Sequence, residues 1–143
     1  MSDTDLIKLY SARILALAAD MPRTTRLADP DATAKTRAPL CGSTVTVGVT
    51  MLDGKLADSG QSVSACEKGQ AAAAVVGANV VGLDLAAVRL GRAQLEAMLK
   101  HDGPAPDAPF DGLEVLLPAR DYKNRHASIL LAFDATLDAL AQI

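Results

Sequence analysis

The strongest constraint on the fold is a strictly alternating segment at residues 44–51, with the sequence TVTVGVTM. Valine or methionine occupies every second position, and threonine or glycine lies between, which is typical of an antiparallel strand with one buried face. Asp53-Gly54 follows almost at once, and this dipeptide favours the tight turn of a β-hairpin. A return strand is therefore predicted over residues 55–63, although serine and glycine dilute its alternation.

An amphipathic helix is predicted before the hairpin, over residues 3–20. Its apolar residues recur at three- to four-residue spacing, at Leu6, Tyr10, Ile14 and Leu17. Ser2 and Asp5 have the pattern of a capping box at its start, and Pro22 ends it. The polar stretch 22–38 is predicted to be an irregular loop, with a short strand near its end at Lys35–Arg37.

Helical patterns also follow the hairpin. The predicted segments are an alanine-rich helix at 66–81, a helix at 85–100, a short turn at 111–117 and a last helix from 121 or 124 to 141. Gly82 is expected to cap the first of these helices at its C-terminus, and Asp84 to cap the second at its N-terminus. Strands segregated from helices indicate an α+β fold, in which several helices pack on a small antiparallel sheet. The length of 143 residues fits one domain, 1–143.

The composition argues against several classes of function. The chain carries 14 basic and 17 acidic residues without a basic stripe, so we expect no nucleic-acid partner. No apolar run is long enough to span a membrane, and the N-terminus lacks the basic segment of a secretory signal. We therefore expect a cytoplasmic protein. No nucleophile elbow or phosphate-binding loop is found in the sequence.

Three residues have the chemistry to bind a metal or to react with sulfur. Cys41 precedes Gly42 and the alternating strand, and Cys66 lies at a predicted helix start, where the helix dipole favours the thiolate. His126 begins the last helix, and a neutral imidazole is a common ligand of soft metals. The cysteines are 25 residues apart and form no CxxC motif, so two buried thiols and a core histidine remain the simpler interpretation from spacing alone.

Three oxygen-bearing residues are further candidate ligands: Ser43, Asp58 and Glu67. Each also has a simpler interpretation. Ser43 can merely start the strand, and Asp58 can be a solvated strand residue. Glu67 can be a favourable charge in the first turn of a helix. We prefer these simpler interpretations from the sequence.

Five short motifs, in order, resemble the U-type iron–sulfur cluster scaffold family, which includes the NifU N-terminal domain, IscU and SufU. They are Leu9-Tyr10 with Pro22-Arg23, Ala38-Pro39-Leu40-Cys41-Gly42, the hairpin with Asp53-Gly54 and Leu56-Ala57-Asp58, Cys66 with Gln70 to Ala74, and His126-Ala127-Ser128-Ile129-Leu130. The resemblance extends over about residues 6–140 and implies the SufE/NifU-like α+β fold. It departs at two site positions, since Ser43 replaces the aspartate that is usual in the family and Ala127 replaces its third cysteine. It also departs after Pro22-Arg23, where Thr24-Thr25-Arg26 replace the asparagine and glycine that are common in the family.

The resemblance implies that Cys41, Cys66 and His126 bind an iron–sulfur cluster, [2Fe–2S] in the first place, or its iron and sulfide precursors. Such a cluster takes four protein ligands. The fourth would come from Glu67, Asp58, a small thiol, water, or a second copy in a homodimer. The implied partners are a cysteine desulfurase and the acceptor proteins that receive the cluster.

Two alternatives stay open beside the scaffold. In the first, zinc bound by the same three residues and an oxygen donor would give a SufU-like acceptor of sulfur from a cysteine desulfurase. In the second, the protein is a degenerate member that has kept the fold, lost the cluster and serves as an interaction module.

Overall fold

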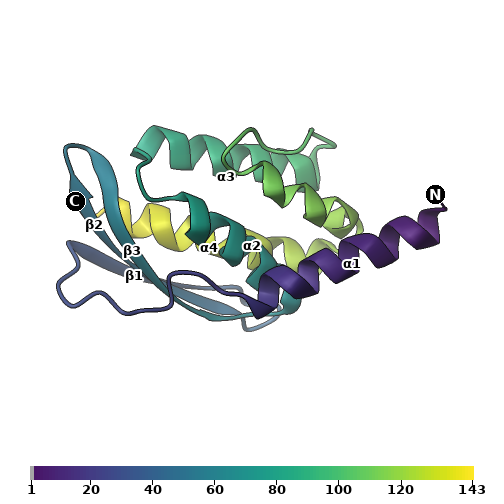
Figure 1. Ribbon diagram of the computed structural model, residues 1–143, viewed down its shortest axis with the longest axis horizontal. Coiled ribbons are helices and arrows are strands. Elements are labelled where there is room, and N and C mark those ends of the chain that lie inside the picture. The colour runs from purple at the N-terminus through teal and green to yellow at the C-terminus, as the bar shows by residue number, and fades with distance from the viewer. Residues whose placement is uncertain (1) are drawn as a thin grey trace.

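The computed structural model describes residues 2–143, so Met1 of the expected domain 1–143 lies outside it. A three-stranded antiparallel sheet, in the order β1-β2-β3, packs with its helices into an α+β fold, as predicted (Figure 1). The elements are α1 (Asp3–Ala19), β1 (Ala32–Arg37), β2 (Thr44–Leu52), β3 (Lys55–Ser64), α2 (Glu67–Asn79), α3 (Leu85–Lys100), the 3₁₀ helices η1 (Asp111–Asp121) and η2 (Lys123–Arg125), and α4 (His126–Leu140).

The predicted hairpin forms the centre of the sheet. Val45, Val47 and Val49 of β2 are almost fully buried, as the alternation required. Asp53 and Gly54 both have positive φ, at 54° and 78°, and so form the turn that joins β2 to β3. The pairing runs from Thr44↔Ser64 at one end to Leu52↔Lys55 at the turn, with a register shift after Thr50.

The strand β1 is longer than the short strand predicted near Lys35–Arg37. It begins at Ala32, which pairs with Val49, and it runs antiparallel to β2 along its whole length. Its sequence, ATAKTR, alternates in burial but turns only alanine and threonine toward the helices. These side chains are too small or too polar to produce the apolar alternation by which strands are recognised in a sequence.

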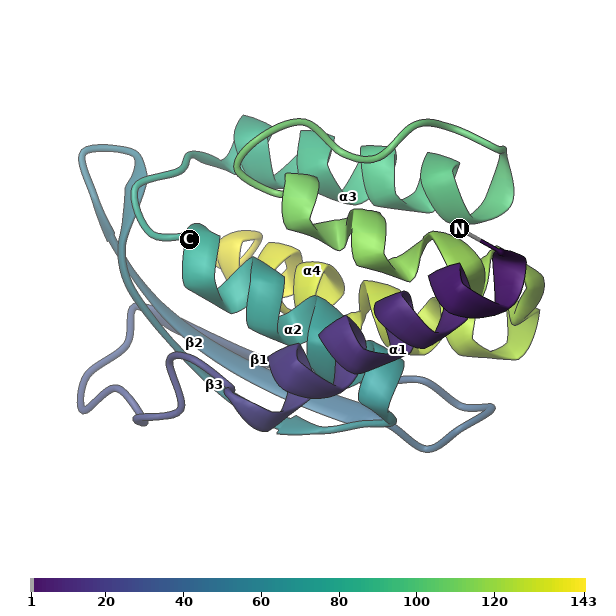
Figure 2. The same cartoon turned by 45° about the vertical axis from the view of Figure 1, so that its right-hand side comes forward.

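The helices cover one face of the sheet in two layers. Helices α2 and α4 lie against the strands, α1 packs on α2, and α3 lies outside α4 (Figure 2). The alanine run of α2 is fully buried, which lets this helix approach its neighbours closely. In the core, Phe110 and Phe133 meet edge to face, with their ring centroids 5.0 Å apart, beside Gly91. No helix in residues 2–143 has the length and apolarity needed to cross a membrane.

Most predicted helix boundaries agree with the structure. The capping box of Ser2 and Asp5 is formed, and Asp84 accepts a hydrogen bond from the backbone N–H of Ala87. The expectation for Gly82 was wrong: α2 ends at Asn79, and Gly82 lies beyond the helix with φ of 92°, where its N–H donates to the carbonyl of Leu56. The short turn predicted at 111–117 extends to Asp121 as a 3₁₀ helix.

Candidate functional site

Three separate segments meet where β2 begins. The turn between β1 and β2 carries Cys41. Gly42 has φ of 70°, and its N–H donates to the carbonyl of Ala38 at 2.8 Å. Cys66 is the N-cap residue of α2, and Ser128 lies in the first turn of α4. Because Thr44 pairs with Ser64, the residues just before β2 and just after β3 lie side by side.

Two serine hydroxyls connect the two cysteines. Ser128 Oγ donates to Ser43 Oγ at 2.9 Å, and Ser43 Oγ lies 3.1 Å from Cys41 Sγ. On the other side, Ser128 Oγ lies 3.5 Å from Cys66 Sγ. A hydroxyl has only one proton. Since Ser128 donates to Ser43, Ser43 can donate to Cys41, and the thiol of Cys66 can donate to Ser128.

The hydrogen bonds favour the thiolate of Cys41. The pKa of Cys41 is lowered to about 7, chiefly by the hydrogen bond from the Ser43 side chain. Burial opposes this change, while the backbone of Ser43 and the side chains of Ser128 and Arg125 add to it. Both cysteines are partly exposed free thiols. Cys41 is therefore substantially ionised at neutral pH and accessible, as a metal ligand or a sulfur nucleophile must be.

A glycine of α2 makes room for the serine that connects the thiols. A Cβ atom on Gly69 would lie 2.5 Å from Ser128 Oγ and 3.2 Å from the Ser128 carbonyl. Helices α2 and α4 thus approach each other closely beside the two thiols, and this approach helps to fix the position of the Ser128 hydroxyl.

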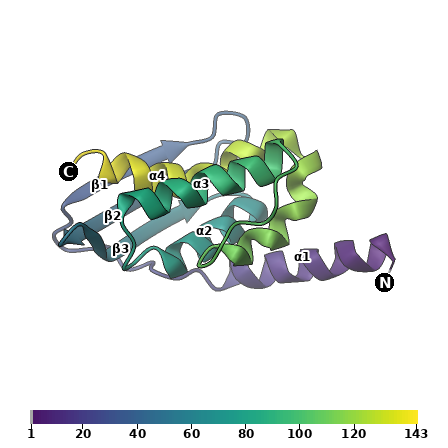
Figure 3. The ribbon, with the colours of Figure 1, turned by 90° about the horizontal axis from the view of Figure 1, so that it is seen from above.

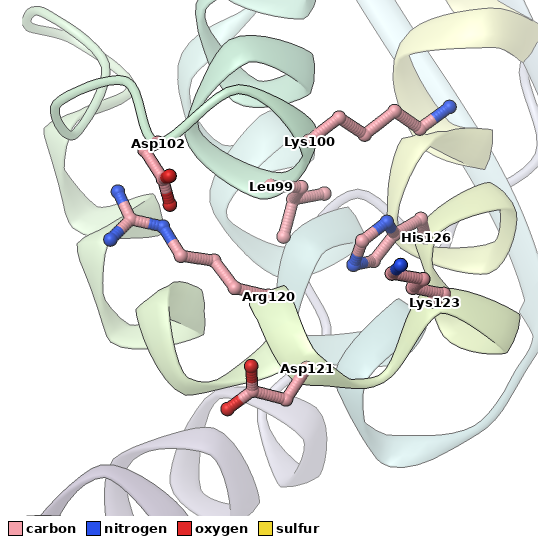
Figure 4. Close-up of a pocket in the computed structure, with 7 residues that line it drawn as sticks. All are labelled: Leu99, Lys100, Asp102, Arg120, Asp121, Lys123 and His126. Carbon is pink, nitrogen blue, oxygen red and sulfur yellow. The ribbon is translucent and has the colours of Figure 1, made fainter.

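His126 lies at the start of α4 and is 5% exposed. Its Nε2 is 2.9 Å from the carbonyl oxygen of Ala119, which can only accept, so Nε2 carries the proton and the Nδ1 lone pair of the neutral ring remains available. The ring borders a cavity of about 390 Å³ between α3 and η1. Arg120 and Asp102 lie on one side of this cavity, and Lys123 lies beside His126 (Figure 4).

The structure brings Cys41 and Cys66 together through the serines, but it does not form a three-ligand group. Among residues 2–143, no three His, Cys, Asp or Glu side chains are close enough to hold one metal ion. The donors gathered at this place are two thiols and two hydroxyls, which suit a soft metal or a cluster only in part, because the usual ligands are thiolates and imidazoles. The assignment of His126 as a third ligand stays a prediction.

The oxygen-bearing candidates differ in their positions. Ser43 is buried and contacts Cys41, so it does more than start a strand. Asp58 forms an ion pair of 3.0 Å with Arg23 and pairs with Thr50, toward the hairpin end of β3. Glu67 is an exposed residue in the first turn of α2, next to Cys66.

Sequence reasoning did not single out Ser128 or Arg125. Ser128 was noted only as part of the motif around His126, and a serine inside a helix carries no signal of its own. The spacing could have indicated that Ser128 lies near the candidate site, because Ser128 follows His126 by two residues in the same first turn of α4.

The chain is similar to solved structures over almost its whole length. A nitrogen-fixing NifU-like protein (N-terminal) from Brucella abortus is 46% identical, with a TM-score of 0.92, and the match covers 99% of this chain and 97% of that one. The SufU protein FiSufU from the thermophile Fervidobacterium islandicum AW-1 is 18% identical, with a TM-score of 0.79, over 93% and 97% of the two chains. A hypothetical protein is 20% identical, with a TM-score of 0.80, over 94% and 98%.

The last two similarities, at this level of identity, concern the fold alone. No family model matches the chain, and no curated protein matches it either.

Proposed function

This chain belongs to the family of NifU-like proteins (N-terminal domain), and on that premise we propose that it is a scaffold or carrier for iron–sulfur cluster assembly. It would bind a labile cluster, or its iron and sulfide precursors, and pass it to acceptor proteins. A cysteine desulfurase would supply the sulfur. The cluster is cargo in this proposal, so the protein is a binding protein and not an enzyme. We place it in the cytoplasm.

The observation that carries the proposal is the meeting of Cys41 and Cys66 at one place. Two partly exposed thiols from distant segments lie at the two ends of a short chain of hydroxyls. Thiolates are the ligands that iron–sulfur clusters use most, and a thiol with a pKa of about 7 becomes a thiolate at little cost near neutral pH.

The remaining ligands would come from elsewhere. His126 is the candidate third donor, since its Nδ1 keeps a lone pair while Nε2 bonds to Ala119. To reach one metal together with the thiols, the start of α4 would have to shift. A homodimer offers another route, because two thiolates from each of two chains make the four ligands of a [2Fe–2S] cluster. A cluster held by fewer than four ligands of one chain would be labile, which suits a cluster that is passed on to acceptor proteins.

A second candidate function, the zinc-bound acceptor of sulfur, is favoured by the low pKa of Cys41. The Cys41 thiolate would attack the outer sulfur of a persulfide on the cysteine desulfurase. A new S–S bond would form on Cys41, the old S–S bond would break, and the thiolate of the desulfurase would leave. Zinc held by Cys41, Cys66, His126 and an oxygen donor, rather than iron, would distinguish this function from the scaffold.

The proposal is tested by anaerobic reconstitution with ferrous iron, cysteine and a cysteine desulfurase, followed by absorption spectroscopy and incubation with an apo-ferredoxin. We expect a cluster spectrum that is absent in Cys41→Ser and present in Ser62→Ala, an exposed serine of β3 that serves as the matched control. We also expect the cluster to move to the ferredoxin.

About one zinc per chain and no cluster would support the sulfur acceptor instead. If the fully folded protein binds no metal, the remaining candidate function would be that of an interaction module without a cluster.

A further inference from the structure

Among residues 2–143, no helix covers the outer face of the sheet. Helices α2, α3 and α4 lie on the other side of the strands (Figures 1 and 3). The segment between α1 and β1 crosses the outer face where Gly48 pairs with Gly60, and a Cβ atom on Gly60 would lie 2.5 Å from a backbone carbonyl of this segment. Beside the crossing, a hollow of about 780 Å³ remains open, and its lining includes Arg26, Thr33 and Thr46.

The charges on the outer face are segregated along the strands. The buried valines of β2 point to the helices, so Thr44 and Thr46 between them point outward. Residues directly opposite one another point to the same side, so their partners in β1, Arg37 and Lys35, also point outward. These two rows of the sheet contain two cations and no carboxylate. The first carboxylate on the outer face of the strands, that of Asp58, lies nearer the hairpin turn and already has an ion pair.

Three cations of this region have no charged partner in the chain. Arg26, Lys35 and Arg37 are exposed, and within the described residues none of them forms an ion pair. The whole chain has a net charge of −3, so these three residues, here called the basic sheet face, are a local excess of positive charge. An unpaired group of cations attracts an anionic partner and raises the rate at which that partner arrives.

The basic sheet face adjoins the two thiols. Thr44, in the row of Arg37, follows Ser43 directly. Arg37 precedes Cys41 by four residues, across a turn that the N–H of Ala38 closes by donating to the carbonyl of Ser43. A protein bound on the basic sheet face would therefore have its own side chains within reach of Cys41.

The chemistry of this face suits a partner that binds briefly. Its strands present threonine, serine, glycine and cations outward, so a partner would be held by charges and hydrogen bonds. Such contacts favour fast association and permit release. An acceptor of the cluster must arrive, take the cluster and leave. During the exchange, thiolates of both proteins approach the same iron atoms, and nearby cations would offset that negative charge.

From this arrangement we infer that the basic sheet face docks an acidic acceptor protein, whose carboxylates contact Arg26, Lys35 and Arg37 while its cysteines take the cluster. The inference rests on the proposed function. The transfer is an exchange of ligands: acceptor thiolates form bonds to iron, the bonds from iron to Cys41 and Cys66 break, and nothing is oxidised or reduced. The protons that the acceptor thiols lose pass to the released thiolates or to water.

Binding of the metal-free protein to an acidic apo-ferredoxin, followed by NMR titration, tests the docking surface without a cluster. We expect the signals of β1 to shift and the dissociation constant to rise at least about tenfold between about 20 mM and 200 mM salt. Lys35→Glu combined with Arg37→Glu should raise the dissociation constant at least about tenfold at low salt.

The matched control is Lys55→Glu combined with Arg89→Glu. It changes the net charge equally, at exposed residues of the hairpin turn and of α3, and should alter the dissociation constant by no more than about twofold. No binding of the apo-ferredoxin, or equal binding by the two double variants, would overturn the inference.

Cluster transfer separates this inference from the proposed function. The wild type and both double variants are loaded with ferrous iron and sulfide, without a desulfurase, and are then mixed with the apo-ferredoxin. All three should load equally, and the Lys35/Arg37 variant alone should transfer about tenfold more slowly. Failure of the wild type to load would contradict the proposed function, while the binding measurement would still decide on the docking surface. A Lys35/Arg37 variant that transfers at the wild-type rate, but loads slowly when a desulfurase supplies the sulfur, would assign the face to the desulfurase and overturn the inference.

Discussion

The hydroxyl of Ser128 donates a hydrogen bond of 2.9 Å to the hydroxyl of Ser43, across 85 residues of sequence. Both serines are almost fully buried, and each also contacts one cysteine. A buried hydroxyl pair between two thiols joins the turn before β2, the start of α2 and the start of α4. The behaviour of Cys41 and Cys66 should therefore depend on these serines.

The reactivity of Cys41 should depend on Ser43. In Ser43→Ala the largest cause of the lowered pKa is gone, so the pKa should rise from about 7 toward the ordinary value of a cysteine. Only the thiolate reacts with iodoacetamide, so alkylation at pH 7 should slow by about three- to tenfold. Mass spectrometry, which distinguishes Cys41 from Cys66, gives the rate as a function of pH. An unchanged midpoint in Ser43→Ala, or an equal shift in the control Ser62→Ala, would contradict the role of Ser43.

Gly69→Ala should disturb the contact between α2 and α4. The new Cβ would lie 2.5 Å from Ser128 Oγ, so the serine or the helix must move. Overpacking of this kind lowers the free energy of unfolding by about 1–3 kcal/mol, and the helix propensity of alanine offsets about 1 kcal/mol of it. Urea denaturation measures the difference. Gly112→Ala is the control, because its nearest neighbour is Val75 at an ordinary 3.6 Å, and equal stability of the two variants would refute the close packing at Ser128.

Asp58→Ala should leave iron binding unchanged. Asp58 is paired with Arg23 and lies six residues from Ser64 along β3, or about 20 Å from the end of the strand next to Cys66. The exposed ion pair contributes little stability, so the variant should also fold normally. Iron per chain after reconstitution is the measurement. A loss of iron comparable to that in Cys66→Ser would restore Asp58 as a candidate ligand.

His126→Ala should affect both stability and metal. Removal of the ring loses the hydrogen bond from Nε2 to the carbonyl of Ala119, which keeps the N–H of Tyr122 as a partner, so the free energy of unfolding should fall by about 1 kcal/mol. If Nδ1 is the third donor, the variant should also lose its cluster faster than wild type under anaerobic conditions. A destabilised variant with an unchanged cluster lifetime would assign His126 a purely structural role.

Much of the fold follows from local patterns in the sequence. The valines of β2, the Asp53-Gly54 turn and the caps at Ser2 and Asp84 each act within a few residues, and all of them were predicted correctly. The errors occurred where local signals are weak. The small residues of β1 give no apolar alternation, and the end of α2 at Asn79 is decided by the chain that follows, where Gly82 bonds to Leu56 of β3.

The candidate site was predictable only in part. Cys41 and Cys66 were recognised by residue type and by the family motifs, and the structure brings them together. The contribution of Ser128 depends on the packing of α4 against Gly69 of α2, and no spacing within one segment reveals such a contact between helices. The same packing holds His126 with its Nε2 turned to Ala119, which the sequence did not indicate.

The most direct test of the proposed cluster site is the content of iron and acid-labile sulfide per chain after anaerobic reconstitution of wild type, Cys41→Ser, Cys66→Ser and Ser62→Ala. We expect iron and sulfide in equal amounts in wild type and in Ser62→Ala, and the loss of most of both in each cysteine variant. A Cys66→Ser protein that keeps the wild-type content of iron and sulfide would contradict a cluster held between the two thiols.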